Sequence, residues 1–341
     1  ETGYLARVVF IMDRLMRPFG LNGKSVVPLL SSVACAIPAV MATRTISNWK
    51  ERMITIFVAP FMSCSARIPV YTLLISLVIP KIYYFGFINL QGFVLFSLYS
   101  LGLIAVLLVS FIMKFIIHSE EKGFLLLELP SYKNPRWTNI GISIIEKIKL
   151  FIFDAGKVIL AISIILWALA SYGPGNSIEE SIDKTKELKS FSDLNEVEKE
   201  RELASVKLEA SYIGRMGKFI EPVISPLGYD WKIGISLITS FAAREVFVGS
   251  LATIYAVQDD GATKTRLIDR LKRDRNSKGE KTYTLASGVS LMVFYVFAMQ
   301  CMSTLAVVKR ETNSWKWPLI QLLVMGVMAY LSAYLVFQLL H

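Results

Sequence analysis

Four long stretches of the sequence contain no charged side chain, and they constrain the fold more than any other feature. These stretches are residues 82–113, 158–178, 282–308 and 317–340. A helix that crosses the hydrocarbon core of a bilayer needs about 20 predominantly apolar residues. Each stretch therefore predicts a transmembrane helix. Together they predict an all-α fold, a polytopic transmembrane helical bundle.

The charge composition supports the same fold class. Charged residues make up 19% of the chain, whereas soluble domains carry about 25%. The net charge of +10 would suggest nucleic acid in a soluble protein, but no basic run alternates with aromatic residues. We therefore expect no nucleic-acid partner, and we assign the excess charge to basic loops on the cytoplasmic side of a membrane.

Three further apolar segments are interrupted by proline or by charge. They are residues 25–43 with Pro28 and Pro38, residues 53–80 with Arg67, and residues 233–258 with Arg244 and Glu245. An ionisable group inside a bilayer costs several kcal/mol and usually faces a cavity or a partner. We therefore expect the functional residues in these three segments.

An internal repeat relates the two ends of the chain. Shifting the sequence by 208 residues places Gly3–Ala34 over Ser211–Ala242, and the Pro-x-Gly-x-x-x-Lys spacing coincides. The following helices match more weakly, with Cys64 over Cys301. Repeats with interrupted helices are typical of secondary transporters, whose substrate sites lie near the bilayer midplane. The match could also reflect chance similarity between membrane helices. The two repeats could be parallel or inverted in the membrane, and the loop charges favour broken segments that cross the membrane fully.

The repeat divides the chain into four expected parts. The first repeat, residues 1–118, contains an amphipathic first helix, a broken helix, the Cys64 helix and a following span. Residues 119–172 form a cytoplasmic linker and a central transmembrane helix. Residues 173–206 form an extracytoplasmic polar loop, which we expect to be partly helical. The second repeat and the C-terminal transmembrane helices take up residues 207–341, with a basic loop at 258–283.

Two of the three cysteines lie close to a proline inside these broken segments. A proline in a helix leaves the carbonyl four residues earlier without its hydrogen bond. Pro38 would free the Ala34 carbonyl beside Cys35, and Pro69 would free the Ser65 carbonyl beside Cys64. A free carbonyl at membrane depth must face protein, water or an ion. Sulfur and carbonyl oxygen, with the hydroxyls of Ser63 and Ser65, would suit a transition metal.

Other candidate ligands depend on weaker signals. Cys301 has no proline nearby, and its polar neighbours are unusual in a long uncharged span. Met62, Met299 and Met302 could add thioether contacts, and Glu245 could bind a cation or titrate during transport. The alternative for each cysteine is a small buried hydrophobic residue, and for Glu245 it is an ion pair with Arg244 or Arg67.

Several motifs resemble the membrane domain of the FeoB family of ferrous iron transporters. They are Glu1-Thr2-Gly3-Tyr4-Leu5-Ala6-Arg7, Cys35-Ala36-Ile37-Pro38-Ala39-Val40-Met41-Ala42-Thr43-Arg44, Ser63-Cys64-Ser65-Ala66-Arg67-Ile68-Pro69, Glu128-Leu129-Pro130-Ser131-Tyr132, Ser240-Phe241-Ala242-Ala243-Arg244-Glu245 and Lys309-Arg310-Glu311-Thr312. The resemblance covers nearly the whole chain, and the second and third of these motifs are specific.

The resemblance implies an Fe(II) permease in the bacterial cytoplasmic (inner) membrane, with Cys35, Cys64 and Cys301 along the path. It also implies an N-terminal GTPase domain that would bind GTP and Mg, a small FeoA-like accessory protein and a homo-oligomer as partners. The chain carries no GTPase motif. We therefore expect that domain to be absent from this chain, and we expect this chain not to be an enzyme.

Two other functions stay open from the residues alone. A nucleoside-type carrier is one, because gate segments also resemble those of nucleoside transporters. Its pocket would need several hydrogen-bonding side chains and an aromatic face, whereas the broken segments offer sulfur and hydroxyls. A membrane-anchored thiol redox sensor is the other, and it would need accessible, reactive thiols.

Overall fold

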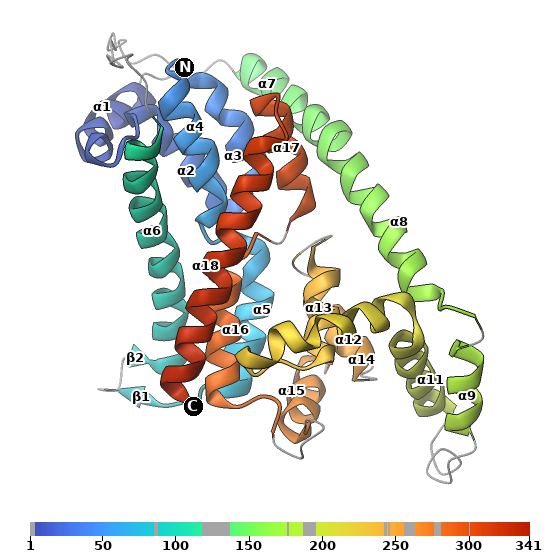
Figure 1. Cartoon of the computed structure of the whole chain (residues 1–341). Helices are drawn as coiled ribbons and strands as arrows, with labels where there is room; N and C mark the ends of the chain where they lie inside the picture. The colour runs from blue at the N-terminus through green and yellow to red at the C-terminus, as the bar shows by residue number, and fades with distance from the viewer. Residues whose placement is uncertain are drawn as a thin grey trace. The chain divides into compact units, whose positions relative to one another are not determined.

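The structure of the chain is a computed structural model, drawn as a ribbon in Figure 1. The residues that it describes are 4–84, 88–117, 137–175, 177–186, 196–241, 244, 246–255, 263–275, 281–299 and 301–341.

The chain forms two compact units, each made of three separate segments. Unit 1 contains residues Glu1–Ala66, Ser97–Val158 and Val296–Val327, and unit 2 contains Arg67–Phe96, Ile159–Tyr295 and Met328–His341. Two long helices, α6 (Leu90–Ile116) and α18 (Lys316–Leu340), contribute residues to both units.

Unit 1 is built around a broken helix and the helices that pack on it. Its remaining helices are α1 (Tyr4–Met16), α2 (Val26–Ala34), α3 (Ala36–Ala42), α4 (Trp49–Val58), α7 (Trp137–Phe151) and α17 (Met302–Thr312), joined in part by short 3-10 turns. The Asp13 carboxylate accepts a hydrogen bond from the backbone N–H of Gly23 at 2.9 Å. A Cβ at Gly23 would lie 2.2 Å from the Val9 carbonyl oxygen. Only glycine therefore allows this turn to lie directly against α1.

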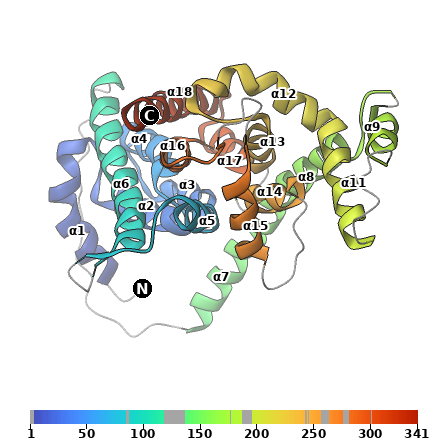
Figure 2. The same ribbon diagram turned by 90° about the horizontal axis from the view of Figure 1, so that it is seen from below.

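Unit 2 repeats this arrangement and adds a polar helical pair. Its helices are α5 (Ile68–Val78), α8 (Lys157–Ser171), α9 (Ser177–Lys186), α11 (Glu196–Ala210), α12 (Tyr212–Ile224), α13 (Trp231–Ser240), α14 (Val246–Ile254), α15 (Thr263–Arg273) and α16 (Leu285–Phe297), and its short hairpin pairs β1 (Tyr83–Tyr84) with β2 (Ile88–Asn89). Helices α9 and α11 lie side by side, as Figures 1 and 2 show. They confirm that the polar segment after Gly173 is partly helical.

Four helical stretches among the described residues are long and apolar enough to cross a membrane. They are Trp49–Val78, Leu90–Ile116, Leu285–Thr312 and Lys316–Leu340. Exposed large apolar side chains are frequent on α6 and α18, as expected for surfaces that face lipid. The structure therefore confirms the polytopic, all-α fold class.

Several expected boundaries differ from those observed. The span expected at 82–113 begins only at Leu90, because the short hairpin precedes it and the Asn89 side chain accepts a hydrogen bond from the Gln91 N–H. The apolar part of α8 covers only Leu160–Ser171. The basic segment 258–283 is not wholly a loop, because α15 forms within it and buries Leu267 and Leu271.

The helix ends confirm the internal repeat. Helices α1 and α12 end at equivalent positions of the repeat, Met16 and Ile224, which are 208 residues apart. A 3-10 turn follows each, closed by Gly20 with φ of 75° and Gly228 with φ of 77°. Glycine adopts this left-handed conformation at little cost. The shared Pro-x-Gly motif thus encodes one backbone turn in both copies.

The packing inside each unit follows the same repeat. In unit 1, α3 packs against α17, and Gly20 packs against Lys114 of α6. In unit 2, the corresponding helices α14 and α5 pack together, and Gly228 packs against Phe337 of α18. Each unit therefore combines the first broken helix of one repeat with the second half of the cysteine-bearing helix of the other repeat.

Candidate metal centre

All three cysteines lie where a helix is interrupted, and all three belong to unit 1. Cys35 separates α2 from α3 with φ and ψ of −156° and 135°. Cys301 precedes α17 with φ and ψ of −149° and 104°. Cys64 lies between the 3-10 turns Ala59–Phe61 and Ser65–Arg67. Extended backbone interrupts the ladder of helical hydrogen bonds, so each thiol lies beside polar backbone groups.

The prolines start the second halves of two broken helices. Pro38 is the third residue of α3, and Pro69 is the second residue of α5. The first turn of a helix tolerates proline because its N–H groups have no helical partner. Cys301 has no such proline, so the sequence did not predict the break between α16 and α17.

The two helices that begin after Cys35 and Cys301 run side by side in the same direction. Helix α3 packs against α17. Beyond the other end of α3, the Arg44 guanidinium binds the Glu311 carboxylate near the end of α17, with an Nη2–Oε1 distance of 2.6 Å. At 1.5 Å per residue, each cysteine precedes this ion pair by about 14–15 Å. The two cysteines therefore lie near the same level of unit 1.

A hydrogen bond joins the Cys64 segment to the Cys35 break. The Ser65 hydroxyl donates to the Ala34 carbonyl at 3.1 Å. We expected Pro38 to leave the Ala34 carbonyl without its helical hydrogen bond. In the structure this carbonyl accepts from the Ser65 hydroxyl. Because a carbonyl oxygen has two lone pairs, the Ala34 carbonyl can still accept a second contact.

Helix α6 covers the other side of the Cys64 segment. A Cβ added at Gly102 would lie 3.2 Å from the Ser63 hydroxyl and 3.2 Å from the Phe61 carbonyl oxygen. Ser63 is buried. Glycine thus allows α6 to approach the interrupted backbone closely.

The candidate ligands differ in exposure. The three cysteines are half-buried, Met62 is half-buried, Met299 is buried, and Met302 and Ser65 are exposed. Within the described part of the chain, no group of three or more His, Cys, Asp or Glu side chains is placed to hold a metal ion. The structure thus brings the three cysteine-bearing breaks into one region without forming a closed coordination cage. Glu245 lies outside the described residues.

A buried carboxylate connects three helices of unit 1 at the end opposite the cysteines. The Glu311 side chain is 3% exposed and accepts hydrogen bonds from Arg44 and Arg52, the latter at 3.0 Å. It thereby joins the end of the α3 segment, α4 and α17. We call these three residues the Glu311 cluster. The sequence did not predict this cluster. It showed only that Arg44 and Glu311 each belong to a motif shared with the FeoB family.

A second polar contact satisfies the backbone where α4 ends. Pro60 has no N–H, which leaves the Ile56 carbonyl without its helical hydrogen bond. The fully buried Gln321 of α18 donates from Nε2 to the Ile56 carbonyl at 3.2 Å and to the Phe57 carbonyl at 2.8 Å. The break that leads to Cys64 is therefore stabilised by a side chain about 260 residues away.

These features define the class of a polytopic membrane protein with two repeats, each containing interrupted helices. Comparison with protein families agrees. The model of the Gate family, described as nucleoside recognition, matches residues 1–78 and 152–315. The model of the ferrous iron transport protein B C terminus matches residues 95–147.

Curated relatives identify the family within this class. The Fe(2+) transporter FeoB of Leptospira interrogans is 44% identical over 338 residues, which cover 99% of this chain and 46% of that protein. The Fe(2+) transporter FeoB of Helicobacter pylori strain 26695 is 32% identical over 98% of this chain and 51% of its own length. The Fe(2+) transport protein A/Fe(2+) transporter FeoB fusion protein of Porphyromonas gingivalis is 35% identical over 99% of this chain and 40% of its length.

The chain therefore belongs to the FeoB family of ferrous iron transport proteins, and it corresponds to a membrane part of its members. It spans about half the length of the curated relatives that it matches. No solved structure matches the chain.

Proposed function

We propose that this chain forms the Fe(II)-conducting part of a transporter, with Cys35, Cys64 and Cys301 as contacts along the path. The observation that carries this proposal is the position of all three cysteines at interrupted helices, joined by α3–α17 packing and by the Ser65–Ala34 hydrogen bond. The relatives carry the name of Fe(2+) transporters, and sulfur ligands favour transition metals over Mg or Ca.

The open arrangement of the cysteines suits a transported ion. A conducted ion must bind strongly enough to enter and weakly enough to leave. Half-buried thiols beside backbone carbonyls, with Met62, Met302, Ser63 and Ser65 nearby, provide several successive contacts rather than one tight cage. The same segments contain few carboxamide groups, so they support the metal over a nucleoside.

We further propose the setting of this transport. The chain acts as a permease rather than an enzyme, and it lies in the bacterial cytoplasmic membrane. The relatives are about twice its length, which leaves room for a GTPase domain that binds GTP and Mg. The fusion protein of Porphyromonas gingivalis supports an FeoA-like partner. A homo-oligomer in the lipid bilayer is part of the same proposal.

Fe(II) uptake by the intact transporter in proteoliposomes tests the proposal. Cys35→Ser, Cys64→Ser and Cys301→Ser should each lower uptake about tenfold or more, because serine keeps the size but removes the soft sulfur ligand. Met302→Leu should lower uptake less, and Met113→Leu, a similar change within α6, should leave it normal. Normal Fe(II) uptake by all three serine variants would refute the cysteine path.

A further inference from the structure

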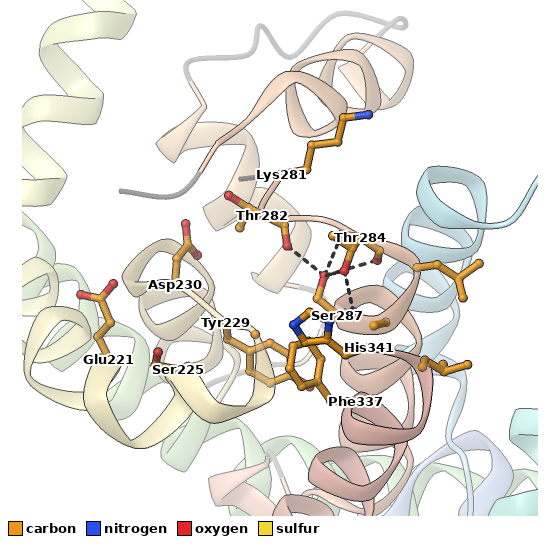
Figure 3. Close-up of a pocket in the computed structure, with 14 residues that line it drawn as sticks. Glu221, Ser225, Tyr229, Asp230, Lys281, Thr282, Thr284, Ser287, Phe337 and His341 are labelled. Carbon is orange, nitrogen blue, oxygen red and sulfur yellow. Dashed lines mark hydrogen bonds between the residues drawn. The ribbon is translucent and has the colours of Figure 1, made fainter. Parts of the chain in front are cut away.

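Unit 2 contains a cavity that the proposed cysteine path does not use. It has a volume of about 520 Å³ and lies where α12 ends, α13 and α16 begin, and α18 ends (Figure 3). Two carboxylates, Glu221 and Asp230, and the hydroxyl side chains of Thr282, Thr284 and Ser287 are among its lining residues. Oxygen atoms thus dominate the polar part of its wall.

The repeat shows how this cavity arises. In unit 1, the N-cap residue Asn22 donates from Nδ2 to the Glu51 carboxylate at 3.0 Å. The shift of 208 residues places Asp230 at the position of Asn22, and both residues cap a helix. Glu51 is the third residue after the N-cap Asn48 of α4, and Ser287 is the third residue after Thr284, which caps α16 in the same way. The Ser287 hydroxyl donates to the Thr282 carbonyl and not to Asp230. An amide with a partner in unit 1 is therefore replaced in unit 2 by a carboxylate beside an open space.

Asp230 uses only one of its oxygens for helix capping. Its Oδ1 accepts a hydrogen bond from the Ile233 N–H at 3.0 Å, and Oδ2 has no hydrogen-bond partner among the described residues. Glu221 lies on the same side of the cavity in Figure 3, whereas the Lys281 ammonium extends away from both carboxylates. The wall formed by Glu221 and Asp230 therefore has excess negative charge.

Thr282 provides an independent sign that a ligand belongs here. Its side chain is 4% exposed, and its hydroxyl is buried without a hydrogen-bond partner in the part of the chain that the structure describes. Its carbonyl accepts from the Ser287 hydroxyl at 2.8 Å, so the backbone of Thr282 is satisfied and the hydroxyl is not. Leaving such a buried group unpaired destabilises the folded protein. Figure 3 shows Thr282 between Lys281 and Asp230 at the cavity wall.

We propose that this cavity is a second cation site, which binds a divalent cation through Asp230 and Glu221. The Thr282 hydroxyl and water molecules complete the coordination. Cations such as Mg²⁺ prefer oxygen ligands and keep several waters while one or two carboxylates hold them, and Mn²⁺ shares the preference for oxygen. The proposed ligands Asp230, Glu221 and Thr282 are oxygen donors, in contrast to the cysteine path, and the site does not depend on that path.

Binding of Mn²⁺ to the intact purified protein, followed by electron paramagnetic resonance, tests this site. Asp230→Asn and Glu221→Gln should each weaken Mn²⁺ binding at least tenfold, and Thr282→Val should weaken it several-fold. Asp230→Asn is a conservative change, because asparagine and aspartate are about equally good N-cap residues. Asn22 already has this role in the other repeat.

Two controls separate this site from the cysteine path. Asp269→Asn, which removes an exposed carboxylate of unit 2, should leave Mn²⁺ binding unchanged, and so should the triple variant Cys35→Ser, Cys64→Ser, Cys301→Ser. Unchanged binding in both Asp230→Asn and Glu221→Gln would overturn the proposal. Loss of the bound Mn²⁺ in the cysteine variant alone would also overturn it, because the ion would then lie on the cysteine path.

Discussion

Asp230 and Asn22 occupy the same helix-capping position in two copies of one repeat, yet their surroundings differ. Asn22 hydrogen bonds to Glu51, whereas Asp230 faces a cavity. Burial raises the pKa of Asp230 to about 6, and Asp274 and Glu221 add to this rise, while the Ile233 N–H and Lys232 oppose it. A single substitution thus separates a structural cap from a group that titrates near neutral pH.

Cation binding in unit 2 should therefore depend on pH. A proton and a cation compete for the Asp230 carboxylate, so Mn²⁺ affinity should fall as the pH decreases through about 6 and stay constant well above it. The charged or titratable groups around Asp230 are Glu221, Lys232, Asp274, Lys281 and His341, together with the hydroxyls of Tyr229, Tyr255 and Tyr283. Mn²⁺ titrations at several pH values check this. The dependence should vanish in Asp230→Asn and persist in His341→Ala, and the opposite pattern would assign it to the histidine.

Glu311 should be essential for the stability of unit 1. Glu311→Gln removes the charge that Arg44 and Arg52 share. We expect a loss of about 1–3 kcal/mol, because the arginine groups lose a charge-assisted partner while solvent screens the half-exposed Arg44. Thermal unfolding of the purified protein should show a lower Tm. Glu209→Gln, in an exposed ion pair with Lys218, should change Tm little, and equal effects of the two changes would contradict this account.

At the scale of single elements, the two left-handed glycines fix the turns that precede the broken helices. A Cβ at Gly228 would lie 2.4 Å from the Phe337 ring, and the φ of 77° disfavours any other residue. The Pro-x-Gly motif marks both turns in the sequence, because proline and glycine act through local backbone geometry.

Gly228→Ala should therefore destabilise the protein by about 1 kcal/mol or more. Gly326→Ala is a matched control in α18, since a Cβ there meets no atom within 4 Å, and alanine favours a helix over glycine by about 1 kcal/mol. Thermal unfolding should show a lower Tm for the first variant and an equal or higher Tm for the second. A Tm for Gly228→Ala at or above that of the wild type would show that the turn is not strained as described.

Other features of the elements were not predictable from the sequence. The break at Cys301 has no proline, and it lies where α17 packs against α3, which is far away in the chain. The partners of Glu311 are 267 and 259 residues away. At the Asp230 cavity, the Ser287 hydroxyl donates to the Thr282 carbonyl and not to Asp230. Local patterns predict helices, turns and repeats, whereas these features come from tertiary contacts between distant segments.

At the scale of the whole molecule, the repeats exchange their halves. Each unit combines the first broken helix of one repeat with the second half of the cysteine-bearing helix of the other. Neither repeat therefore forms a unit by itself. The sequence predicted the repeat and the all-α fold class, but an exchange of this kind leaves no mark in the spacing of residues.

This exchange explains why the candidate path needs both repeats. Cys35 comes from the first repeat and Cys301 from the second, and the packing of α3 against α17 sets them at one level of unit 1. Since the Glu311 cluster joins the opposite ends of the same helices, Glu311→Gln should also weaken Fe(II) uptake. Arg44→Lys should have a similar but smaller effect, because lysine keeps the charge and loses the bidentate geometry.

The most direct test of the cysteine path is the iron K-edge X-ray absorption spectrum of the intact protein loaded with Fe(II). Asp230→Asn in all samples removes the proposed oxygen site from the signal. We predict sulfur in the first coordination shell of iron, reduced in each single Cys→Ser variant and lost when Cys35, Cys64 and Cys301 are all replaced. A first shell of oxygen and nitrogen alone, unchanged by the triple replacement, would contradict the central claim that these cysteines contact the transported ion.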